Sequence, residues 1–512
     1  MSDKALLIEN NKRIIRNTSM LYFRMLVMMI VTLYTSRVVL NTLGVEDFGI
    51  YHAVAGFVTM MAFLSNAMTS ATQRFLSFEI GREDKTKLHN VFVMSVNIHL
   101  LIALFIIVLA ETLGLWFFNE YLTIPQERLA AAHWVYQISI LVLIVNMISV
   151  PYNAMIIAHE KMNVYAWVSM IEVSFNLLIV FMLQWFGFDK LKFYSVLVLI
   201  VAILSKLIYC VYCHIKYEES RYVFFWDAGL FKRLFSYAGW NLWGSSASVI
   251  MGQGINVILN MFFGPIVNAA YAVAMRVKSA ANQFVSNFQM ALNPPIIKSY
   301  AGGQIEFMHQ LIYKGAKYSY FLLFTLSLPI LLETEVILRL WLKTVPDFTV
   351  VFTRLVIANI LIESLSKPLM TSAQATGKIK LYQGVVGGLL VINLPVSFLI
   401  LKLGFPPQST LWASICISIV AIAVRLIIVR RLVKLNVRRF ISQVIFICLL
   451  ISVTSVPIPL LLHMNLEFSF ARFILVVFLS VIFSIISIYL LGLDVKEKEF
   501  FLSYLGRIIR RQ

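Results

Sequence analysis

The feature that most constrains the fold is a series of long apolar segments that runs from one end of the chain to the other. Each has about 20 residues or more, the length of helix needed to cross a hydrocarbon core of about 30 Å. Backbone groups in lipid must be paired within the protein, and long apolar runs without a two-residue period predict helices, not barrel strands. The sequence therefore predicts an all-α polytopic membrane protein with about 14 transmembrane helices. The predicted segments are 17–40, 48–77, 90–118, 129–157, 162–187, 191–215, 234–263, 266–297, 311–332, 350–376, 381–403, 408–430, 440–463 and 469–492.

Composition and charge agree with a membrane environment. Hydrophobic residues make up 60% of the 512 residues and charged residues only 13%, whereas soluble domains carry about a quarter charged residues. The net charge is +18, and most lysines and arginines lie in the N-terminal arm, in alternate loops and in the C-terminal tail. This alternation predicts that both termini are cytoplasmic. We expect the basic loops to face anionic membrane lipids and expect no nucleic-acid partner, because no exposed aromatic residues accompany the charge.

An internal repeat relates the two halves of the chain. The stretch RVVLNTLGVEDFGIYHAVAGF from Arg37 returns as NVILNMFFGPIVNAAYAVAMR from Asn256, at an offset of 219 that becomes 220 at the glycine, so that Gly44 corresponds to Gly264. A second pair of similar stretches begins at Pro151 and Pro368, 217 residues apart. Two matches at nearly equal spacing predict a duplicated lobe of six helices, and an even number of helices makes the two repeats parallel.

The predicted organisation follows from this repeat and from the loops. We expect a cytoplasmic arm, an N-lobe, a cytoplasmic linker, a C-lobe, an appended helix pair and a basic cytoplasmic tail. Their predicted bounds are 1–16, 17–215, 216–233, 234–433, 440–492 and 493–512.

Basic residues inside the apolar segments are the strongest candidates for chemistry. Arg24, Arg276 and Lys278 lie deep in predicted spans, where a charge that faces lipid costs about 2.5–3.5 kcal/mol on an insertion scale. A water-filled cavity removes most of that cost, so we expect them to line a cationic cavity for an anionic cargo. Arg74 lies nearer a segment end, where its side chain can also reach the headgroup region. Two other basic residues, Lys206 and Lys367, also lie deep in their segments, whereas Arg37, Arg354 and Arg425 lie near segment ends as Arg74 does.

Carboxylates are fewer in the segments. Glu172 and Glu363 either pair with the buried cations or titrate as sites for a coupling ion, H⁺ or Na⁺, and the sequence leaves both alternatives open. No phosphate-binding loop, nucleotide fold or nucleophile elbow is present. The four cysteines suggest neither a disulfide framework nor a complete metal site. We therefore expect no catalytic residue, no cofactor and no metal.

Polar residues recur on one face of several segments, at the spacing of a helix. Segment 266–297 has two such stripes on roughly opposite faces, one containing Lys278 and the other Arg276, and the sequence does not determine which one faces a cavity. Segment 48–77 has Gly56 and Val58 where these two cations stand. The expected polar lining of the cavity consists of Asn66, Ser70, Gln73, Asn241, Ser245, Asn282, Ser286 and Gln289.

The stretches RVVLNTLGVEDFGIYHAVAGFV and QRFLSFEIGRED, with Asn17-Thr18 at the start of the first segment, resemble the N-terminal motif of Wzx-type polysaccharide flippases. These proteins belong to the multidrug/oligosaccharidyl-lipid/polysaccharide (MOP) exporter superfamily, with MATE-type drug exporters and MurJ-type lipid II flippases. The resemblance covers the first two segments closely. It implies a V-shaped pair of six-helix lobes around a cavity lined by the first, second, seventh and eighth helices.

The resemblance also implies a function. Wzx-type flippases move undecaprenyl-pyrophosphate-linked repeat units of O-antigen, capsule or exopolysaccharide from the cytoplasmic to the outer face of the bacterial inner membrane. We accordingly predict a flippase, not an enzyme, that works by alternating access. Arg24, Arg276 and Lys278 would engage the pyrophosphate, with Arg74 a weaker candidate near the cytoplasmic entry. The polyprenyl tail would stay in lipid, and a polysaccharide polymerase is a candidate partner.

Two alternatives remain. A cation-coupled drug exporter of the MATE type would be expected to carry a carboxylate in its first helix, where this chain has Arg24. A membrane glycosyltransferase or polymerase that uses lipid-linked sugars would carry an acidic outer loop, and Glu46-Asp47 lies in such a position. The outer loops are short, however, and carboxylates also favour the start of a helix.

Overall fold

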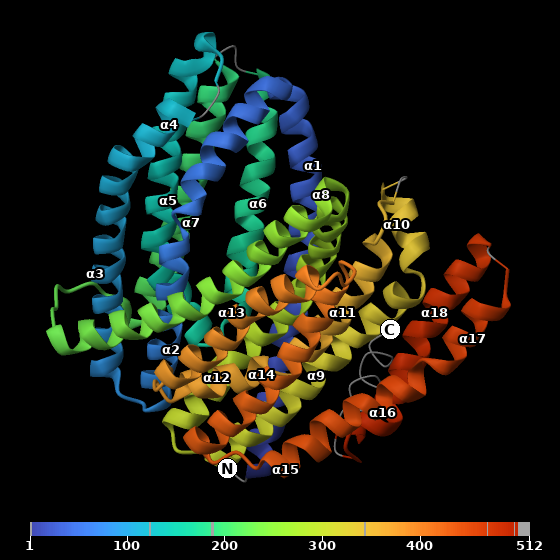
Figure 1. Cartoon of the computed structure of the whole chain (residues 1–512). Coiled ribbons are helices and arrows are strands. Elements are labelled where there is room, and N and C mark those ends of the chain that lie inside the picture. Colours follow the sequence, from blue (N-terminus) through green and yellow to red (C-terminus); the bar gives the residue numbers. More distant parts are fainter. Residues whose placement is uncertain are drawn as a thin grey trace, which may run out of the picture. The chain divides into compact units, whose positions relative to one another are not determined.

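The computed structural model describes residues 3–121, 124–185, 189–342, 345–467, 469–495 and 497–499. Contacts divide the chain into unit 1, which is Met1–Leu242 with Ile297–Gly303, and unit 2, which is Trp243–Ile296 with Gln304–Gln512. Every regular element in the described residues is helical (Figure 1). The α-helices that lie in unit 1 are α1 (Asp3–Met60), α2 (Phe63–Gly81), α3 (Lys85–Leu109), α4 (Leu115–Tyr121), α5 (Leu129–Ala158), α6 (Met162–Trp185) and α7 (Lys190–Lys216).

Helix α8 (Ala228–Ala301) has its two ends in unit 1 and its middle in unit 2. The predicted linker 216–233 therefore includes the first turns of α8, which Asp227 caps by accepting hydrogen bonds from the N–H groups of Gly229 and Leu230. The division between the units falls inside α8. The α-helices of unit 2 that follow are α9 (Ile305–Leu332), α10 (Thr334–Leu342), α11 (Thr349–Ser364), α12 (Lys367–Ala375), α13 (Lys380–Lys402), α14 (Ser409–Val433), α15 (Val437–Phe440), α16 (Phe446–Ser455), α17 (Pro457–Asn465) and α18 (Phe470–Ser487).

The predicted all-α membrane fold is confirmed. Among the described residues, twelve helices are long and apolar enough to cross a membrane, and a bent pair would be a thirteenth. The remaining predicted segment, 266–297, is helical as the second half of α8, but its two polar stripes make it less apolar than the twelve. The chain is thus a multi-pass membrane protein.

Three predicted continuous helices are broken, and one of them, 350–376, is interrupted at Leu365–Ser366 between α11 and α12. Segment 48–77 bends by 52° between Glu46–Met60 and Ser65–Gly81. At the bend, the N–H groups of Met61 and Ala62 bond three residues back, which tightens the helix locally. Segment 440–463 is interrupted between α16 and α17 at Pro457, whose ring cannot continue a helix without a kink.

Helices α1 and α8 are each two helices joined at a glycine. Gly44 has φ 82° and ψ 165°, and Gly264 has φ 75° and ψ −167°. This combination of a positive φ with an extended ψ is accessible essentially to glycine alone. The two glycines correspond in the sequence repeat, so the duplication extends to the backbone conformation.

Two further pairs of residues show the same correspondence. Glu83 has φ 58° and Gly303, 220 residues later, has φ 74°. Glu160 has φ 59° and Gly377, 217 residues later, has φ 75°. Each pair ends a helix at equivalent turns of the two repeats. The first repeat thus holds glutamates in a left-handed conformation where the second repeat has glycines.

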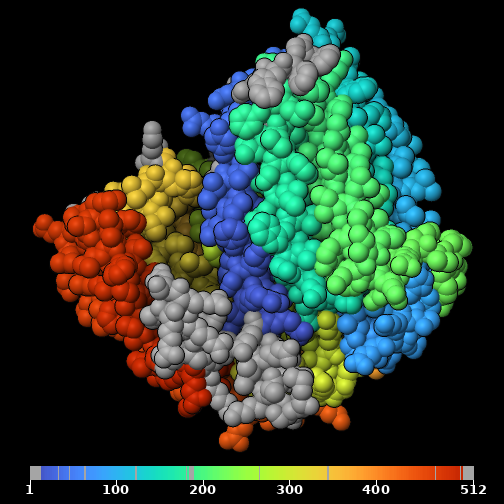
Figure 2. All heavy atoms as spheres, turned by 180° about the vertical axis from the view of Figure 1, so that it is seen from behind, coloured from blue at the N-terminus to red at the C-terminus, as the bar shows by residue number. Residues whose placement is uncertain are grey.

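The core of unit 1 is an apolar cluster contributed by α1, α3 and α5. Val54, Val58 and Ile106 are almost fully buried in it. The Tyr136 hydroxyl donates a hydrogen bond to the Ala110 carbonyl at 2.7 Å, where α3 passes into a π-helical turn and the same carbonyl also accepts from the Leu115 N–H. Along the outside of this core, α1 packs against α6, which Figure 2 shows as neighbouring blue and teal surfaces.

In unit 2, α9 packs against α11, α12 and α18. A buried ion cluster ties the appended helices α17 and α18 to the end of α9. The Glu333 carboxylate has no exposed surface, and it accepts hydrogen bonds from Arg472 at 2.9 Å and contacts His463 Nδ1 at 2.8 Å. The appended pair is therefore attached to α9 by charge as well as by apolar packing.

Candidate functional site

Arg24 lies on the face of α1 that packs against α6. Its guanidinium carbon is 4.6 Å from the centroid of the Tyr165 ring, a cation–π contact. Glu172 on α6 interacts with it electrostatically, and Tyr209 on α7 interacts with both charged groups. The Arg24 Nε is buried and has no hydrogen-bond partner within the described chain. Unit 1 thus brings together Arg24 and Glu172, two of the predicted site residues.

Arg74 on α2 is 6% exposed. Its guanidinium carbon lies 4.5 Å from the ring centroids of both Phe75 and Phe78 and 5.8 Å from that of Tyr237. This aromatic box covers the charge. A cargo could contact Arg74 only after one of the three rings moves.

The predicted polar lining residues of unit 1 have unequal exposure. Asn66 and Ser70 are exposed on α2, and Gln73 is partly buried. Asn241, near the start of α8, is buried. In this conformation the side chains of Asn66 and Ser70 are therefore the most accessible of the four.

In unit 2, the predicted residues Lys278 and Glu363 form an ion pair, with 3.5 Å between Nζ and Oε1. The Asn359 amide donates to the same Oε1 at 2.9 Å. Lys367 at the start of α12 interacts electrostatically with Lys278, Glu363 and Arg425 of α14. Glu363 therefore faces Lys278 and Lys367, and Arg425 adds a third positive charge beside Lys367. The two cations that were not assigned to the site, Lys367 and Arg425, belong to the same cluster.

A comparison of equivalent positions in the two repeats identifies the cations of this cluster. At the equivalent positions of the first repeat, Lys278 matches Val58, Lys367 matches Val150 and Arg425 matches Ile208. Each cation thus replaces an apolar residue that the same fold accepts.

The stripe of α8 that contains Lys278 contacts neighbouring helices of unit 2. The Gln289 amide donates to Ser319 Oγ on α9 at 2.6 Å, and Thr371 Oγ1 on α12 donates to Asn293 Oδ1 at 2.7 Å. The other predicted lining residues of unit 2 are more exposed than Gln289. Asn282 is partly buried, whereas Ser245 and Ser286 are exposed.

Arg276 belongs to the other stripe of α8 and is exposed. Within the described residues it makes neither an ion pair nor a hydrogen bond. It lines a hollow of about 330 Å³ together with residues of α9, α10 and α11. Arg276 is thus the one predicted cation whose charge has no partner among the described side chains.

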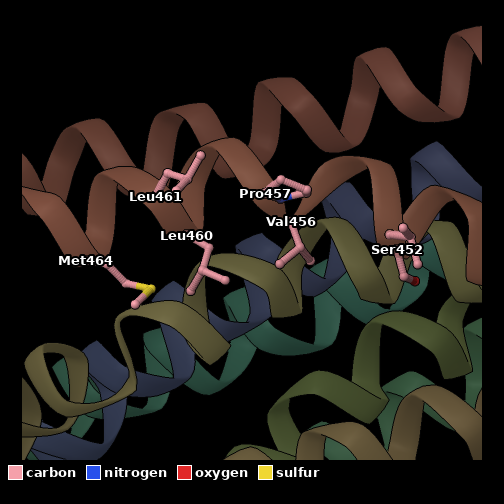
Figure 3. Close-up of a pocket in the computed structure, with 7 residues that line it drawn as sticks. Ser452, Val456, Pro457, Leu460, Leu461 and Met464 are labelled. Atoms are coloured by element: carbon pink, nitrogen blue, oxygen red, sulfur yellow. The ribbon is translucent and has the colours of Figure 1, made fainter.

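A second hollow, of about 520 Å³, lies along α16 and α17 (Figure 3). Val456, Leu460 and Met464 project on the same side of α17. Its polar lining residue, Ser452, is already engaged by the Tyr320 hydroxyl at 2.7 Å and by the Cys448 carbonyl. This hollow offers an apolar surface and no free polar group.

Asp47, the second residue of the acidic pair, lies in the first helical turn after Gly44 and has a structural partner. Arg128 donates to both carboxylate oxygens of Asp47, at 2.8 and 2.6 Å, and to both oxygens of Asp189 at 3.1 Å. Asp47 therefore holds α5 and the start of α7 near α1. This arrangement does not resemble an open carboxylate site for lipid-linked sugars.

A buried ion cluster at the other end of unit 1 was not expected from the sequence. The Glu160 side chain is 1% exposed, and its carboxylate lies 2.7 Å from Arg13 Nε and 2.8 Å from Lys298 Nζ. Asn17 donates to its backbone carbonyl at 3.0 Å. Burial, and then the nearby Lys298 and Lys161, lower the pKa of the adjacent His159 to about 4. The cluster joins the start of α1, the α5–α6 turn and the end of α8.

Comparison with known proteins assigns the family. A family model described as "Polysaccharide biosynthesis protein" matches residues 14–299, which is more than half of the chain. The chain belongs to the polysaccharide biosynthesis protein family. No curated protein matches it. The matched region of this family member contains Arg24, Arg74, Arg276 and Lys278.

Solved structures show that this polysaccharide biosynthesis protein has the MATE fold. An outward-facing multidrug resistance MATE family transporter of the MOP superfamily superposes with a TM-score of 0.68 at 14% identity, over 83% of this chain and 96% of that one. A MOP superfamily transporter from Pyrococcus furiosus gives 0.69 at 14% identity with the same coverage. The MATE transporter ClbM in complex with Rb⁺ gives 0.66 at 15% identity, over 84% and 96%. The predicted MATE-like fold is confirmed.

Proposed function

We propose that this protein flips undecaprenyl-pyrophosphate-linked oligosaccharides from the cytoplasmic to the outer face of a bacterial inner membrane. The observation that carries the proposal is the basic excess inside unit 2. Arg276, Lys278, Lys367 and Arg425 lie on helices of unit 2, and Glu363 is the carboxylate that pairs with Lys278 and interacts with Lys367. A pyrophosphate is a multiply charged anion, which arginine and lysine bind strongly where the dielectric constant is low. A carrier of cationic drugs would need the opposite balance of charge.

The side chains have separate roles in this proposal. Arg276 binds the pyrophosphate first, because its charge is unpaired, and Lys278 joins when its ion pair with Glu363 loosens. Arg24 serves the same cargo from unit 1, and Arg74 does so only if its aromatic box opens. The exposed Asn, Gln and Ser side chains supply hydrogen bonds to the sugar hydroxyls. The hollow on α17 suits the distal polyprenyl tail, which needs only an apolar surface.

Transport is proposed to proceed by alternating access, with both termini in the cytoplasm. The carboxylates Glu172 and Glu363 are the candidates for coupling to H⁺ or Na⁺. Both lie beside a cation that competes with the coupling ion for the carboxylate. A polysaccharide polymerase that takes up the flipped unit is the proposed partner.

The test is reconstitution of the full chain in vesicles with a labelled undecaprenyl-pyrophosphate-linked oligosaccharide. We expect Arg276→Gln to slow flipping about tenfold or more, because it removes the unpaired cation. Arg37→Gln is the matched control, since Arg37 is exposed near the end of its membrane segment, and it should change the rate by less than about twofold. Equal rates for the two variants, or efflux of a cationic dye in place of flipping, would contradict the proposal.

A further inference from the structure

The hollow beside Arg276 has features that point to a ligand. Arg276 follows Gly264 by twelve residues, which places it about 18 Å along the helix from the turn at that end. The predicted membrane segment begins at residue 266, so Arg276 lies about 15 Å inside it, where a hydrocarbon core is about 30 Å thick. A guanidinium at that depth needs water or an anion, and no carboxylate of the described chain supplies one.

The wall of the hollow is mainly hydrocarbon. Val277 and Ala280 come from α8, Ile330 from α9, and Leu338 and Trp341 from α10. Such a wall would bind a sugar poorly, because sugar hydroxyls lose their hydrogen bonds to water and gain few in return. The combination of one free cation with an apolar wall suits an amphiphile that has an anionic end.

One hydroxyl in the wall lacks a partner. Thr353 on α11 is 1% exposed, and its Oγ1 has no hydrogen-bond partner in the described chain. Thr334, which also lines the hollow, donates to the Ile330 carbonyl and accepts from Arg354 Nε. Buried hydroxyls are normally satisfied, so the orphan hydroxyl of Thr353 indicates a site for a ligand oxygen. The hollow on α17 contains neither a free cation nor an orphan hydroxyl.

We propose that this hollow holds the junction between the pyrophosphate and the first isoprene units of the polyprenyl carrier. This inference rests on the proposed function and adds to it the position of the lipid. Arg276 binds the phosphate oxygens, Thr353 donates to a phosphate or ester oxygen, and the apolar wall surrounds the proximal isoprenes. A volume of about 330 Å³ is at the small end of ligand pockets. It admits one narrow chain beside the phosphate, whereas a glycerophospholipid brings two chains that begin together at the glycerol.

The experiment measures binding to the full-length protein in nanodiscs with two probes, farnesyl pyrophosphate and inorganic pyrophosphate. Ala280→Phe fills the hollow from an exposed position of α8, and Ser279→Phe adds the same ring at the next exposed position, which does not line the hollow. We expect Ala280→Phe to weaken the binding of farnesyl pyrophosphate on the order of tenfold. The binding of inorganic pyrophosphate should change by less than about twofold. Ser279→Phe should leave both unchanged. Pyrophosphate binding also serves as the check that each variant is folded.

Two further measurements complete the test. Thr353→Val should weaken the binding of farnesyl pyrophosphate, because it removes the hydroxyl that donates to a ligand oxygen. It should raise the Tm of the ligand-free protein, because it removes an unsatisfied buried hydroxyl. Phosphatidylglycerol at an equal mole fraction should not displace farnesyl pyrophosphate. Displacement by phosphatidylglycerol, or equal effects of Ala280→Phe and Ser279→Phe, would overturn the inference.

Failure of this inference can be told apart from failure of the proposed function. If Arg276→Gln weakens inorganic pyrophosphate but Ala280→Phe leaves farnesyl pyrophosphate unaffected, the hollow is not the lipid site and the flippase proposal stands. If Arg276→Gln alters neither the binding of pyrophosphate nor the flipping rate, the anion site itself is wrong, and both proposals fall.

Discussion

Gly44 and Gly264 adopt nearly the same backbone conformation, with φ values of 82° and 75° and ψ values of 165° and −167°. They occupy equivalent positions of the two repeats. An added Cβ would meet no atom within 4 Å at either glycine, so the need for glycine comes from the backbone angles alone and not from crowding.

Gly44→Ala and Gly264→Ala should therefore each lower the free energy of unfolding by about 1–3 kcal/mol. The measurement is the Tm of the purified protein in detergent or nanodiscs. Gly252→Ala is the matched control, because Gly252 is within helical α8 and also has no atom within 4 Å of an added Cβ. It should be neutral or stabilising by up to about 1 kcal/mol. Equal losses at Gly252 and Gly264 would contradict the conformational argument.

Much of this fold could be predicted from the sequence, because the length of the apolar segments and the internal repeat are strong signals. Segment length predicts membrane helices, and the repeat locates the glycine break of α8 from that of α1. The bend at Met61–Ala62 was missed because no glycine or proline marks it. Pro457 marks the break between α16 and α17. The apolar run continues across this proline, however, so the sequence predicts one continuous helix.

The site was harder to predict because a side chain's partner is not visible in a sequence. Arg74 and Arg276 are both arginines within predicted helices, yet aromatic rings enclose the first and the second has no partner among the described residues. Lys367 and Arg425 join Lys278 through packing between α8, α12 and α14. Only a comparison of the repeats, which shows where an apolar residue gives way to a cation, would have grouped them.

Glu160 has a left-handed backbone conformation and a buried carboxylate, and we expect the ion cluster of that carboxylate to stabilise the fold. Glu160→Gln should lower the free energy of unfolding by about 2–4 kcal/mol, because it leaves Lys298 and Arg13 without their counter-charge. Glu83→Gly is the comparison, since Glu83 has the same positive φ but is exposed, and relief of strain should stabilise the protein by up to about 1 kcal/mol. Thermal unfolding of the two variants decides the matter. A Glu160→Gln protein as stable as the natural one would show that the ion cluster contributes nothing.

His159 gives a prediction for pH. Burial, with the positive charges of Lys298 and Lys161, lowers its pKa in the folded state to about 4, against about 6.5 in an unfolded chain. Because the unfolded state binds the proton more readily, stability is greatest above about pH 6.5 and falls as the pH drops towards 4.

Between pH 7.5 and 5.5 the loss from this group should be about 1 kcal/mol. His159→Gln should remove that part of the pH dependence, and Tm measured at both pH values in the two proteins is the check. His133, whose ring centroid lies 4.6 Å from that of Phe118, supplies a control substitution elsewhere in unit 1. If His133→Gln and His159→Gln flatten the profile equally, the assignment to His159 is wrong.

A substitution of Glu363 distinguishes two roles of its carboxylate, which either balances the nearby cations or takes part in binding the cargo. The carboxylate neutralises part of the charge of Lys278 and Lys367. Glu363→Gln should therefore tighten the binding of inorganic pyrophosphate about tenfold, because it frees Lys278 from its ion pair with the carboxylate, and should lower the Tm because the cations of the cluster then repel one another. Adding Lys278→Met to this variant removes one cation and should return both quantities towards their natural values. Calorimetric titration of the single and double variants measures the coupling between the two side chains. Weaker binding by Glu363→Gln would show instead that the carboxylate takes part in holding the cargo or a coupling ion, and not in balancing the cations.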